Sequence, residues 1–450
     1  MPAFPHRFLR AEAAAARWVI AGQLTLNVVL LLGGAWLASL GNRLAVFLMV
    51  LIPLAFLPFS YARVRLHRLL EAHVTRSIVW PATATGLIFD AIMVAQVLTG
   101  RQPEPPSILY RSGITWIGAV WFSGHALLLL GYAGVGFVRL ARRCIRHVWS
   151  HFPAAALPAA EVEIGRRALL QKAGLFGAAL PFGVSLSGVS LSYDFRVEER
   201  EIMLPAWPAA LDGLRVVHLS DIHVGGAMNR RRLLRVASLT NACRPDLVLH
   251  SGDFLTHRAG DFDAPLYDAL ARIRAPHGQW ACFGNHDFDD PQRLERRLRD
   301  CGVTVLRNRV ADLSVKGERI ELAGIDYQFD RSQRALAYAR IVAAWGPRRS
   351  VPRILLNHDP SVFKTLPAGC ADLVLSGHTH GGQIGWQVDA SHAITVIGLA
   401  GLPDQGLFSR DDMCLYVTRC VGFYGYPMRI GIPPEIALLV LRSLPTQRQA

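Results

Sequence analysis

The stretch "DLVLSGHTHGGQIGW", from Asp372 to Trp386, is the most informative part of the sequence. An apolar run ends abruptly, two histidines follow with one residue between them, and glycines crowd the next positions. Histidine is costly to bury and glycine weakens regular structure, so a core strand does not continue in this way. The pattern indicates a buried strand whose end carries functional side chains.

The C-terminal half of the chain repeats this design. From Leu211 onward, short apolar runs alternate with helical patterns, which is typical of an α/β fold. Two segments predict the intervening helices, "RRRLLRVASLTNAC" and "PQRLERRLRDCG", the second with Pro291 at its start and Gly302 at its end. The apolar runs that predict strands are "LRVVHLS", "DLVLHSG", "GQWACFG", "RIELAGI", "RILLNHD" and "DLVLSGH".

Polar side chains follow five of these runs where each predicted strand ends. In open α/β sheets, sites form at the carboxyl ends of strands, so we expect five strands to deliver these side chains to one crevice. The residues are Asp221 and His223, then Asp253, then Asn285 with His286 and Asp287, then His358, and finally His378 and His380.

These residue types suit a pair of metal ions. Carboxylate, imidazole and amide ligands without thiolate fit Mn, Fe or Zn. Asp221 and His223 are two residues apart, and so are His378 and His380. Residues i and i+2 of an extended chain point to the same side, so each pair could converge on one centre or on two neighbouring centres.

Taken in order, the motifs D-x-H, G-D, G-N-H-D, N-H and G-H-T-H resemble the calcineurin-like metallophosphoesterase family. The form G-H-T-H-G-G-Q and the closing "VGFYGYPMRIGIPPEI" are similar to its bacterial membrane-associated branch. The resemblance covers roughly residues 211–442. It implies two β-sheets packed face to face with helices on both outer sides, a four-layer α-β-β-α sandwich, and two divalent metal ions (Mn, Fe or Zn).

The resemblance also implies roles for the motif residues. His286 would lie near the leaving group, with Asp287 orienting it. The chain departs from many relatives after G-D, where "GDFLTH" ends in His257 instead of carrying an acidic residue. His257 either faces substrate or lies on the surface. The resemblance assigns Asp221, His223, Asp253 and His380 to one metal, and Asp253 (as a bridge), Asn285, His358 and His378 to the second.

A hydrolytic mechanism follows from this ligand set. Two divalent ions roughly 3.5–4 Å apart share a water and lower its pKa, which supplies a bridging hydroxide for in-line attack on phosphorus. His286 would protonate the departing alkoxide, a contribution of roughly 10²–10⁴ in rate. Gly377, Gly381 and Gly382 would allow positive φ and a close approach of the backbone to metals and phosphate.

The N-terminal part has a different composition. Residues 1–172 contain 17 Lys and Arg against 6 Asp and Glu, whereas the rest contains 31 against 28, so the basic excess lies in the apolar part. Cationic flanks of membrane helices explain this excess better than nucleic-acid binding does. Arginines beside the segments predict a cytoplasmic N-terminus. Four segments are long enough to cross a bilayer: Trp18–Leu40, Leu44–Ala62, Ile78–Gly100 and Ile114–Leu140.

A fifth segment, Ala173–Tyr193, has no charged residue and follows "GRRALLQK", which resembles a twin-arginine export signal. If it spans, the following domain lies on the periplasmic or extracellular side of the plasma membrane; the alternative is a re-entrant or docked helix. The predicted organisation is a membrane region with four helices (1–160), a fifth helix and linker (161–195) and a catalytic domain (196–450).

Several hypotheses remain open at this point. The preferred one is a multi-pass, membrane-anchored phosphoesterase acting on a lipid-linked or envelope phosphate ester. Alternatives are a phosphodiesterase for soluble substrates with the membrane part as anchor only, and a non-hydrolytic membrane sensor. Asp90 and His125, both within predicted membrane segments, either form a structural hydrogen-bonded pair or handle protons or ligand. The seven cysteines form no C-x-x-C pair.

Overall fold

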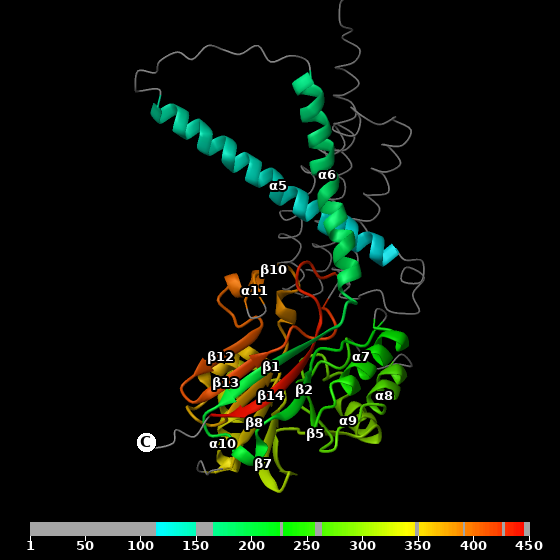
Figure 1. The fold of residues 1–450 in the computed structure, drawn as a ribbon, viewed down its shortest axis with the longest axis vertical. Coiled ribbons are helices and arrows are strands. Elements are labelled where there is room, and N and C mark those ends of the chain that lie inside the picture. Colours follow the sequence, from blue (N-terminus) through cyan, green and yellow to red (C-terminus); the bar gives the residue numbers. More distant parts are fainter. Residues whose placement is uncertain are drawn as a thin grey trace, which may run out of the picture. The chain divides into compact units, whose positions relative to one another are not determined.

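A computed structural model describes residues 114–149, 165–225, 228–256, 263–346, 351–389, 392–424 and 428–444. The three N-terminal membrane segments predicted before Ile114 lie outside these residues, as does Asp90. Two compact units are present, and all strands belong to the unit containing Ser187–Ala450. The prediction of an α/β fold is confirmed for the described residues (Figure 1).

Two six-stranded mixed sheets form the body of this unit. The first has the order β1-β14-β2-β3-β4-β5, with β2 to β5 parallel and β14 antiparallel to β2. Its strands are β1 (Arg196–Leu204), β2 (Leu214–Leu219), β3 (Leu247–His250), β4 (Gln279–Ala281), β5 (Val303–Val305) and β14 (Glu435–Ser443).

The second sheet has the order β12-β13-β9-β8-β7-β6, in which β13, β9, β8 and β7 are parallel and the two edge strands antiparallel. Its strands are β6 (Arg309–Val315), β7 (Glu318–Ile325), β8 (Arg353–Asn357), β9 (Leu373–Ser376), β12 (Gly406–Arg410) and β13 (Met413–Val417). A short hairpin, β10 (Gly385–Gln387) with β11 (Ala393–Thr395), follows β9.

Helices connect the strands. Asn229 caps α7 by accepting a hydrogen bond from the Arg232 N–H, and Asp290 caps α9 in the same way through Arg293, with Pro291 in the first turn. The helices of this unit are α7 (Arg230–Ala242), α8 (Ala264–Leu270), α9 (Pro291–Asp300), α10 (Arg331–Trp345), α11 (Val396–Leu399) and the 3₁₀ turns η1 (Ala209–Leu211), η2 (Pro360–Thr365) and η3 (His380–Gly382).

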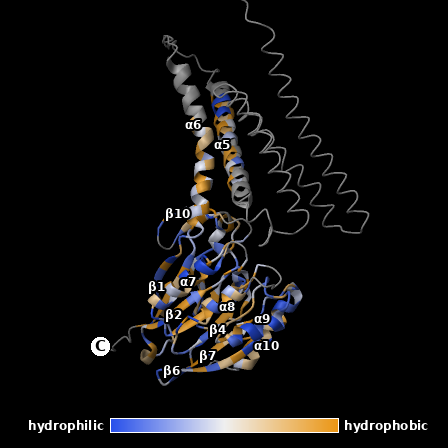
Figure 2. Cartoon of the chain, turned by 90° about the vertical axis from the view of Figure 1, so that its right-hand side faces the viewer, coloured by the Kyte–Doolittle hydropathy of each residue, from blue (hydrophilic) through white to orange (hydrophobic). Residues whose placement is uncertain are grey.

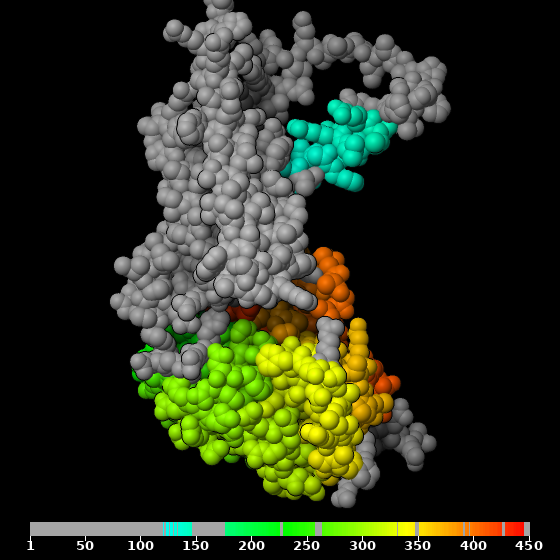
Figure 3. Space-filling model, turned by 180° about the vertical axis from the view of Figure 1, so that it is seen from behind, coloured from blue at the N-terminus to red at the C-terminus, as the bar shows by residue number. Residues whose placement is uncertain are grey.

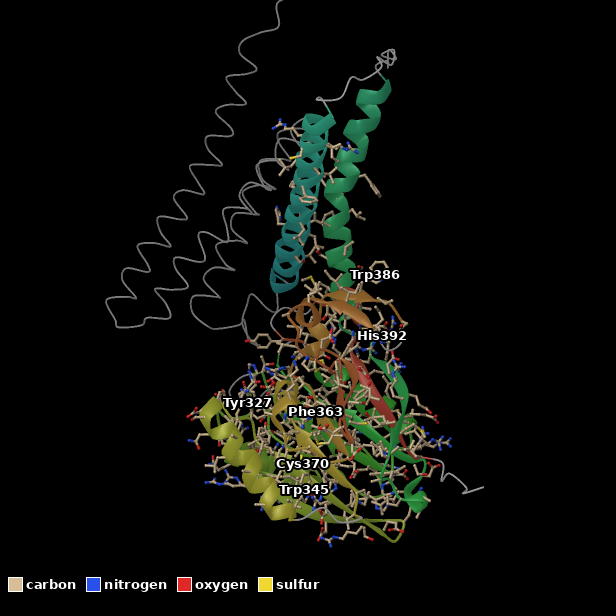
Figure 4. The ribbon with its side chains drawn as sticks, turned by 90° about the vertical axis from the view of Figure 1, so that its left-hand side faces the viewer. Tyr327, Trp345, Phe363, Cys370, Trp386 and His392 are labelled. Atoms are coloured by element: carbon tan, nitrogen blue, oxygen red, sulfur yellow. The ribbon has the colours of Figure 1, made fainter. Side chains whose placement is uncertain are left out.

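Three hydrophobic clusters hold these elements in layers. Alternate residues of β2 serve different layers: Val216 packs between the two sheets, whereas Val217 packs against helices α7, α8 and α9. A third cluster joins the second sheet to α10 and η2 through residues such as Trp345 and Phe363 (Figure 4). The strands of this unit carry hydrophobic residues along their length (Figure 2). Seen from behind, the part of the chain with α8, α9 and α10 forms the visible face of this unit (Figure 3).

The other unit contains α5 (Ile114–Trp149) and most of α6 (Gly165–Leu191). Within α5, Ser123–Ile145 is the one stretch in the described residues that is long and apolar enough to cross a membrane, and it overlaps the fourth predicted segment. In α6 the apolar stretch is Phe176–Leu191, shorter than the roughly 20 residues that a span needs. His125 is buried, with its ring edge-on to Phe182 at 5.1 Å.

Candidate dinuclear metal site

The seven predicted metal ligands all follow the carboxyl ends of strands, some in the first sheet and some in the second. Asp221 and His223 follow β2, Asp253 follows β3, and Asn285 follows β4 in the first sheet. In the second sheet His358 follows β8, while His378 and His380 follow β9. His257 lies outside the described residues, so its two interpretations stay open.

The first cluster consists of Asp221, His223 and His380, whose potential ligand atoms lie within 4.8 Å of one another. All three side chains are buried. The Asp221 Oδ1 atom is 3.2 Å from His380 Nε2 and 3.7 Å from His223 Nε2. Three donor atoms therefore converge from two different sheets.

The second cluster consists of Asp253, His358 and His378. His358 Nε2 lies 3.2 Å from Asp253 Oδ2 and 3.1 Å from His378 Nδ1. Nitrogens that bind a metal lie about 2.1 Å from it, so two of them on one ion would be about 3–3.5 Å apart. The separation of the two rings thus fits a shared ion.

Asp253 connects the two clusters. The same oxygen that faces His358, Oδ2, also lies 3.5 Å from His223 Nε2 in the first cluster. The other oxygen, Oδ1, accepts a hydrogen bond of 2.8 Å from the backbone N–H of His286, which fixes the carboxylate plane. One carboxylate oxygen is thus directed at both clusters, as a bridging ligand requires.

Several donor atoms in the clusters have no hydrogen-bond partner among the described residues. They include Asp221 Oδ1 and His223 Nε2 of the first cluster, both buried. Asn285 Oδ1, which follows β4 and belongs to neither cluster, is also buried and without a hydrogen-bond partner. Unpartnered buried oxygens and nitrogens are rare because they lose their water without compensation. A metal ion in each cluster would satisfy them, so the residues present fit two divalent ions.

The hydrogen bonds around His358 set its tautomer. Its Nδ1–H donates to the carbonyl of Ser251 at 2.8 Å, which leaves Nε2 as the ligand atom. Burial would lower the pKa of His358, but Asp253 and Asp221 outweigh burial and raise the pKa to about 10. Burial would raise the pKa of Asp253, but His358 and His223 lower the pKa to about 2. The carboxylates therefore attract positive charge to this point of the molecule.

The backbone at the ligands is unusual. Five of the seven predicted ligands have positive φ: Asp221 (51°), His223 (49°), Asp253 (55°), His378 (69°) and His380 (52°). Side chains seldom adopt this left-handed conformation, and where they do the residue is commonly functional. The expectation that the two-residue pairs converge through an extended chain was wrong. Both members of each pair have left-handed backbone instead, and His378 and His380 lie in different clusters.

The glycines of the opening stretch serve two different purposes. Gly381 and Gly382 have φ of 61° and 76°, as expected. Gly377 is not in this region, but a Cβ there would lie 2.1 Å from Ser220 Oγ and 2.2 Å from Asp221 Oδ2. Gly377 is therefore needed for the close approach of β9 to the first cluster.

We expect Gly377→Ala to weaken metal binding in the first cluster. The added methyl group must displace Asp221, and overpacking of this kind costs about 1–3 kcal/mol of unfolding free energy. Metal content per chain and thermal unfolding would be measured together. Gly183→Ala is the control, because a Cβ at Gly183 in α6 meets nothing within 4 Å. Unchanged metal content in Gly377→Ala would contradict this reading of the glycine.

His286 and Asp287 come directly after Asn285 along the chain and belong to neither cluster. His286 Nδ1 lies 2.9 Å from the carbonyl of Thr256, so Nδ1–H donates there. The Asp287 carboxylate accepts hydrogen bonds from the backbone N–H groups of Asp253 (2.7 Å), Phe254 (2.9 Å) and Gly284 (2.9 Å). Burial and the nearby Asp253 raise the pKa of Asp287 to about 7.

These contacts tie Asp287 to the loop that carries Asp253, because both of its oxygens accept hydrogen bonds from backbone N–H groups there. The role that the resemblance implied, orientation of the His286 ring, stays a prediction.

Some residues beside the clusters carry no sequence signal. Tyr327 lies 5.8 Å from the His378 ring, and Tyr424 lies 5.3 Å from the His286 ring, measured between ring centroids. Cys420 Sγ and Ser220 Oγ donate to Asp221 Oδ2 at 3.1 Å and 2.5 Å. The closing motif "VGFYGY" indicated only a family resemblance and did not place Tyr424 beside the site.

Comparison with known proteins matches the same region. A model of the calcineurin-like phosphoesterase family matches residues 214–382. A "transmembrane protein with metallophosphoesterase domain" from Danio rerio is 33% identical over 260 residues, which are 55% of this chain and 57% of that protein. The uncharacterized metallophosphoesterase YkuE of Bacillus subtilis is 29% identical over 295 residues, 62% of this chain and 99% of that protein.

The chain spans only about half the length of the first curated relatives it matches, 57% and 52%. Among solved structures, phosphopantetheinyl hydrolase from Mycobacterium tuberculosis has 13% identity and a TM-score of 0.30, over 48% of this chain and 91% of that one. A TM-score of this size carries no argument about fold or function.

Proposed function

We propose that this chain, whose residues 214–382 match the calcineurin-like phosphoesterase family, is a membrane-anchored, dinuclear-metal-dependent phosphoesterase acting on a lipid-linked or envelope phosphate ester. The observation that carries the proposal is the Asp253 Oδ2 atom, which faces ligand atoms of both clusters. The ligand clusters characteristic of this metal-dependent family are intact. A domain that only sensed ligands would have no need to keep every one of them.

We assign Asp221, His223, Asp253 and His380 to one metal, and Asp253, Asn285, His358 and His378 to the other. Two divalent ions held there would activate water and offset negative charge on a phosphoryl group. The buried carboxylates and imidazoles would hold the ions. The metals would be Mn, Fe or Zn, since the donor set lacks thiolate.

His286 supplies the proton that the leaving group needs. With Nδ1 engaged by the Thr256 carbonyl, the ring is held so that Nε2–H can donate to the departing oxygen. Asp287 contributes by fixing the Asp253 loop. The Tyr327 ring lies beside His378 of the second cluster, and the Tyr424 ring lies beside His223 of the first, with centroids 5.8 Å and 6.1 Å apart, so both are suited to contact the organic part of an ester.

The membrane part of the proposal rests on apolar helices. Ser123–Ile145 can span a bilayer, and the apolar stretch of α6 leads within a few residues into β1. We propose plasma-membrane attachment, with residues 196–450 as the catalytic domain on the periplasmic or extracellular side. The test is a C-terminal fusion to a reporter that works only in the cytoplasm. An active reporter would contradict placement of the catalytic domain on the periplasmic or extracellular side.

Removal of metal provides the first test of activity. Chelation of the full chain in detergent should abolish hydrolysis of p-nitrophenyl esters, and Mn²⁺ should restore it, because both clusters lose their cations. Metal analysis should find two ions per chain in the active protein. Hydrolysis that survives complete removal of metal would refute the mechanism.

A substrate comparison tests the substrate class. The full chain would be assayed with phospholipid headgroup esters in vesicles, with cyclic nucleotides and with p-nitrophenyl esters. Preference for the vesicle-embedded esters supports the proposal. Turnover of soluble esters alone would favour a phosphodiesterase for soluble substrates whose membrane part is only an anchor.

A further inference from the structure

An apolar surface lies on the segment that follows His380. On the β10–β11 hairpin Trp386 is 73% exposed, and on α11 Leu399 is 79% exposed. Trp386 pairs directly with Ile394 across the hairpin, and paired residues of antiparallel strands point to the same face. We call this set, all exposed, the apolar surface: Trp386, Val388, Ile394, Leu399 and Leu402.

The apolar surface is poor in charge. From 384 to 402 the sequence contains one acidic residue, Asp389, and no lysine or arginine. Asp389 itself lies 3.0 Å from His392, beyond the end of β10. Covering the hairpin would therefore remove few charges from water. Exposed apolar patches of this kind mark surfaces that meet a partner or a membrane.

The apolar surface is fixed to the metal ligands. The carbonyl of Asp404 accepts a hydrogen bond of 2.6 Å from Thr379 Oγ1, between the two histidines His378 and His380. The carboxylate of Asp404 accepts one of 2.5 Å from Thr395 Oγ1 at the end of β11. Any object that binds the hairpin is thereby held in a fixed relation to the candidate metal site.

Hydrogen bonds connect the apolar surface to the end of the apolar helix α6. The carbonyl of Gly188, in the last turn of the apolar helix, accepts a hydrogen bond from the Arg429 N–H at 3.0 Å. The next residue, Ile430, exchanges backbone hydrogen bonds with the start of the hairpin, through Gly385 (2.9 Å) and Gln383 (2.9 Å). Arg429 and Ile430 thus lie between the end of α6 and the start of β10. Trp386 lies at this end of the unit (Figure 4).

We propose that the apolar surface docks into the interfacial layer of the bilayer to which the apolar helices attach, and so holds the metal site at the level of lipid headgroups. Tryptophan favours this layer because its ring is apolar and its N–H is polar. Aliphatic side chains beside it add buried apolar area. The inference rests on the proposed function for its substrate, a headgroup phosphate ester, but the docking itself can be measured without turnover.

The first experiment measures docking directly. The full chain is placed in vesicles with and without brominated lipid, and its tryptophan fluorescence is compared with that of Trp386→Phe. The difference signal, which belongs to Trp386, should be quenched by bromine. Trp280→Phe, at a half-buried position of β4, is the control and should leave the size of the quenched signal unchanged. A Trp386 signal that bromine does not quench overturns the docking.

The second experiment measures its consequence. Trp386→Ser with Ile394→Ser should lower kcat/KM for vesicle-embedded esters about tenfold or more, and change that for soluble esters less than about twofold. Leu336→Ser, an exposed leucine on α10, should change neither. Equal turnover of vesicle esters by the variant and the parent would contradict the role of the surface.

The two experiments separate the inference from the proposed function. Quenching of Trp386 without hydrolysis of any ester would support docking and refute the phosphoesterase. A parent chain that is dimeric in detergent, with a monomeric double variant, would show instead that the surface joins two copies, and would overturn docking to lipid.

Discussion

The Asp253→Asn variant should bind at most one metal ion per chain and lose at least about 10³-fold in kcat, since removing a metal that offsets phosphoryl charge costs several kcal/mol of transition-state stabilisation. The structure explains why an isosteric change is so damaging. An amide can still accept from the His286 N–H through its oxygen, as Asp253 Oδ1 does now. It must then turn an NH₂ group toward His223 and His358, where the bridging oxygen stands.

Metal analysis and steady-state kinetics on the purified full chain would test this expectation. Asp263→Asn is a matched control, because Asp263 is also a buried carboxylate but contacts Tyr267 and Arg293 at the start of α8. It should lower the free energy of unfolding yet retain two metals. If Asp253→Asn kept both ions and full activity, the bridging assignment would be wrong.

The second large effect concerns the leaving group. His286→Gln should lower kcat by about 10²–10⁴-fold for esters with an alkyl leaving group, which departs only when protonated. For p-nitrophenyl esters the loss should be far smaller, because p-nitrophenolate is stable without a proton. Metal content should not change, since His286 belongs to neither cluster.

The ratio of the two losses distinguishes proton donation from a structural role. His277→Gln serves as the control, because His277 is half-buried and its backbone N–H and carbonyl make hydrogen bonds beside β4. Equal losses on alkyl and p-nitrophenyl esters would show that His286 supports the site without donating the proton.

Local sequence patterns predicted the strands that carry the site. Each of the six apolar runs forms a strand, and helices α7 and α9 begin where the sequence indicates. The reason is local: buried parallel strands are apolar on both faces, and Pro291 and the caps define helix starts. Five strands deliver their polar ends to one place because parallel strands share a carboxyl edge.

Other parts could not be predicted in this way. Strand β14 lies between β1 and β2 in the first sheet, a pairing of residues more than 200 positions apart that no local pattern encodes. The left-handed backbone at Asp221 and His378 was also missed, since it depends on loop contacts and not on residue type. The hydrogen bonds of Asp287 to the Asp253 loop were hidden for the same reason.

The division of the ligands between the sheets has a consequence for how the protein acquires its metals. Asp221 and His223 come from one sheet and His380 from the other; Asp253 comes from the first, and His358 and His378 from the second. A nascent chain whose sheets have not yet stacked therefore offers only a fragment of either set. Metal uptake must be a late event in biogenesis, and ions that bind only the assembled domain will stabilise it against unfolding. A substitution in the apolar layer between the sheets, remote from any ligand, should thus lower the metal content of the protein in cells.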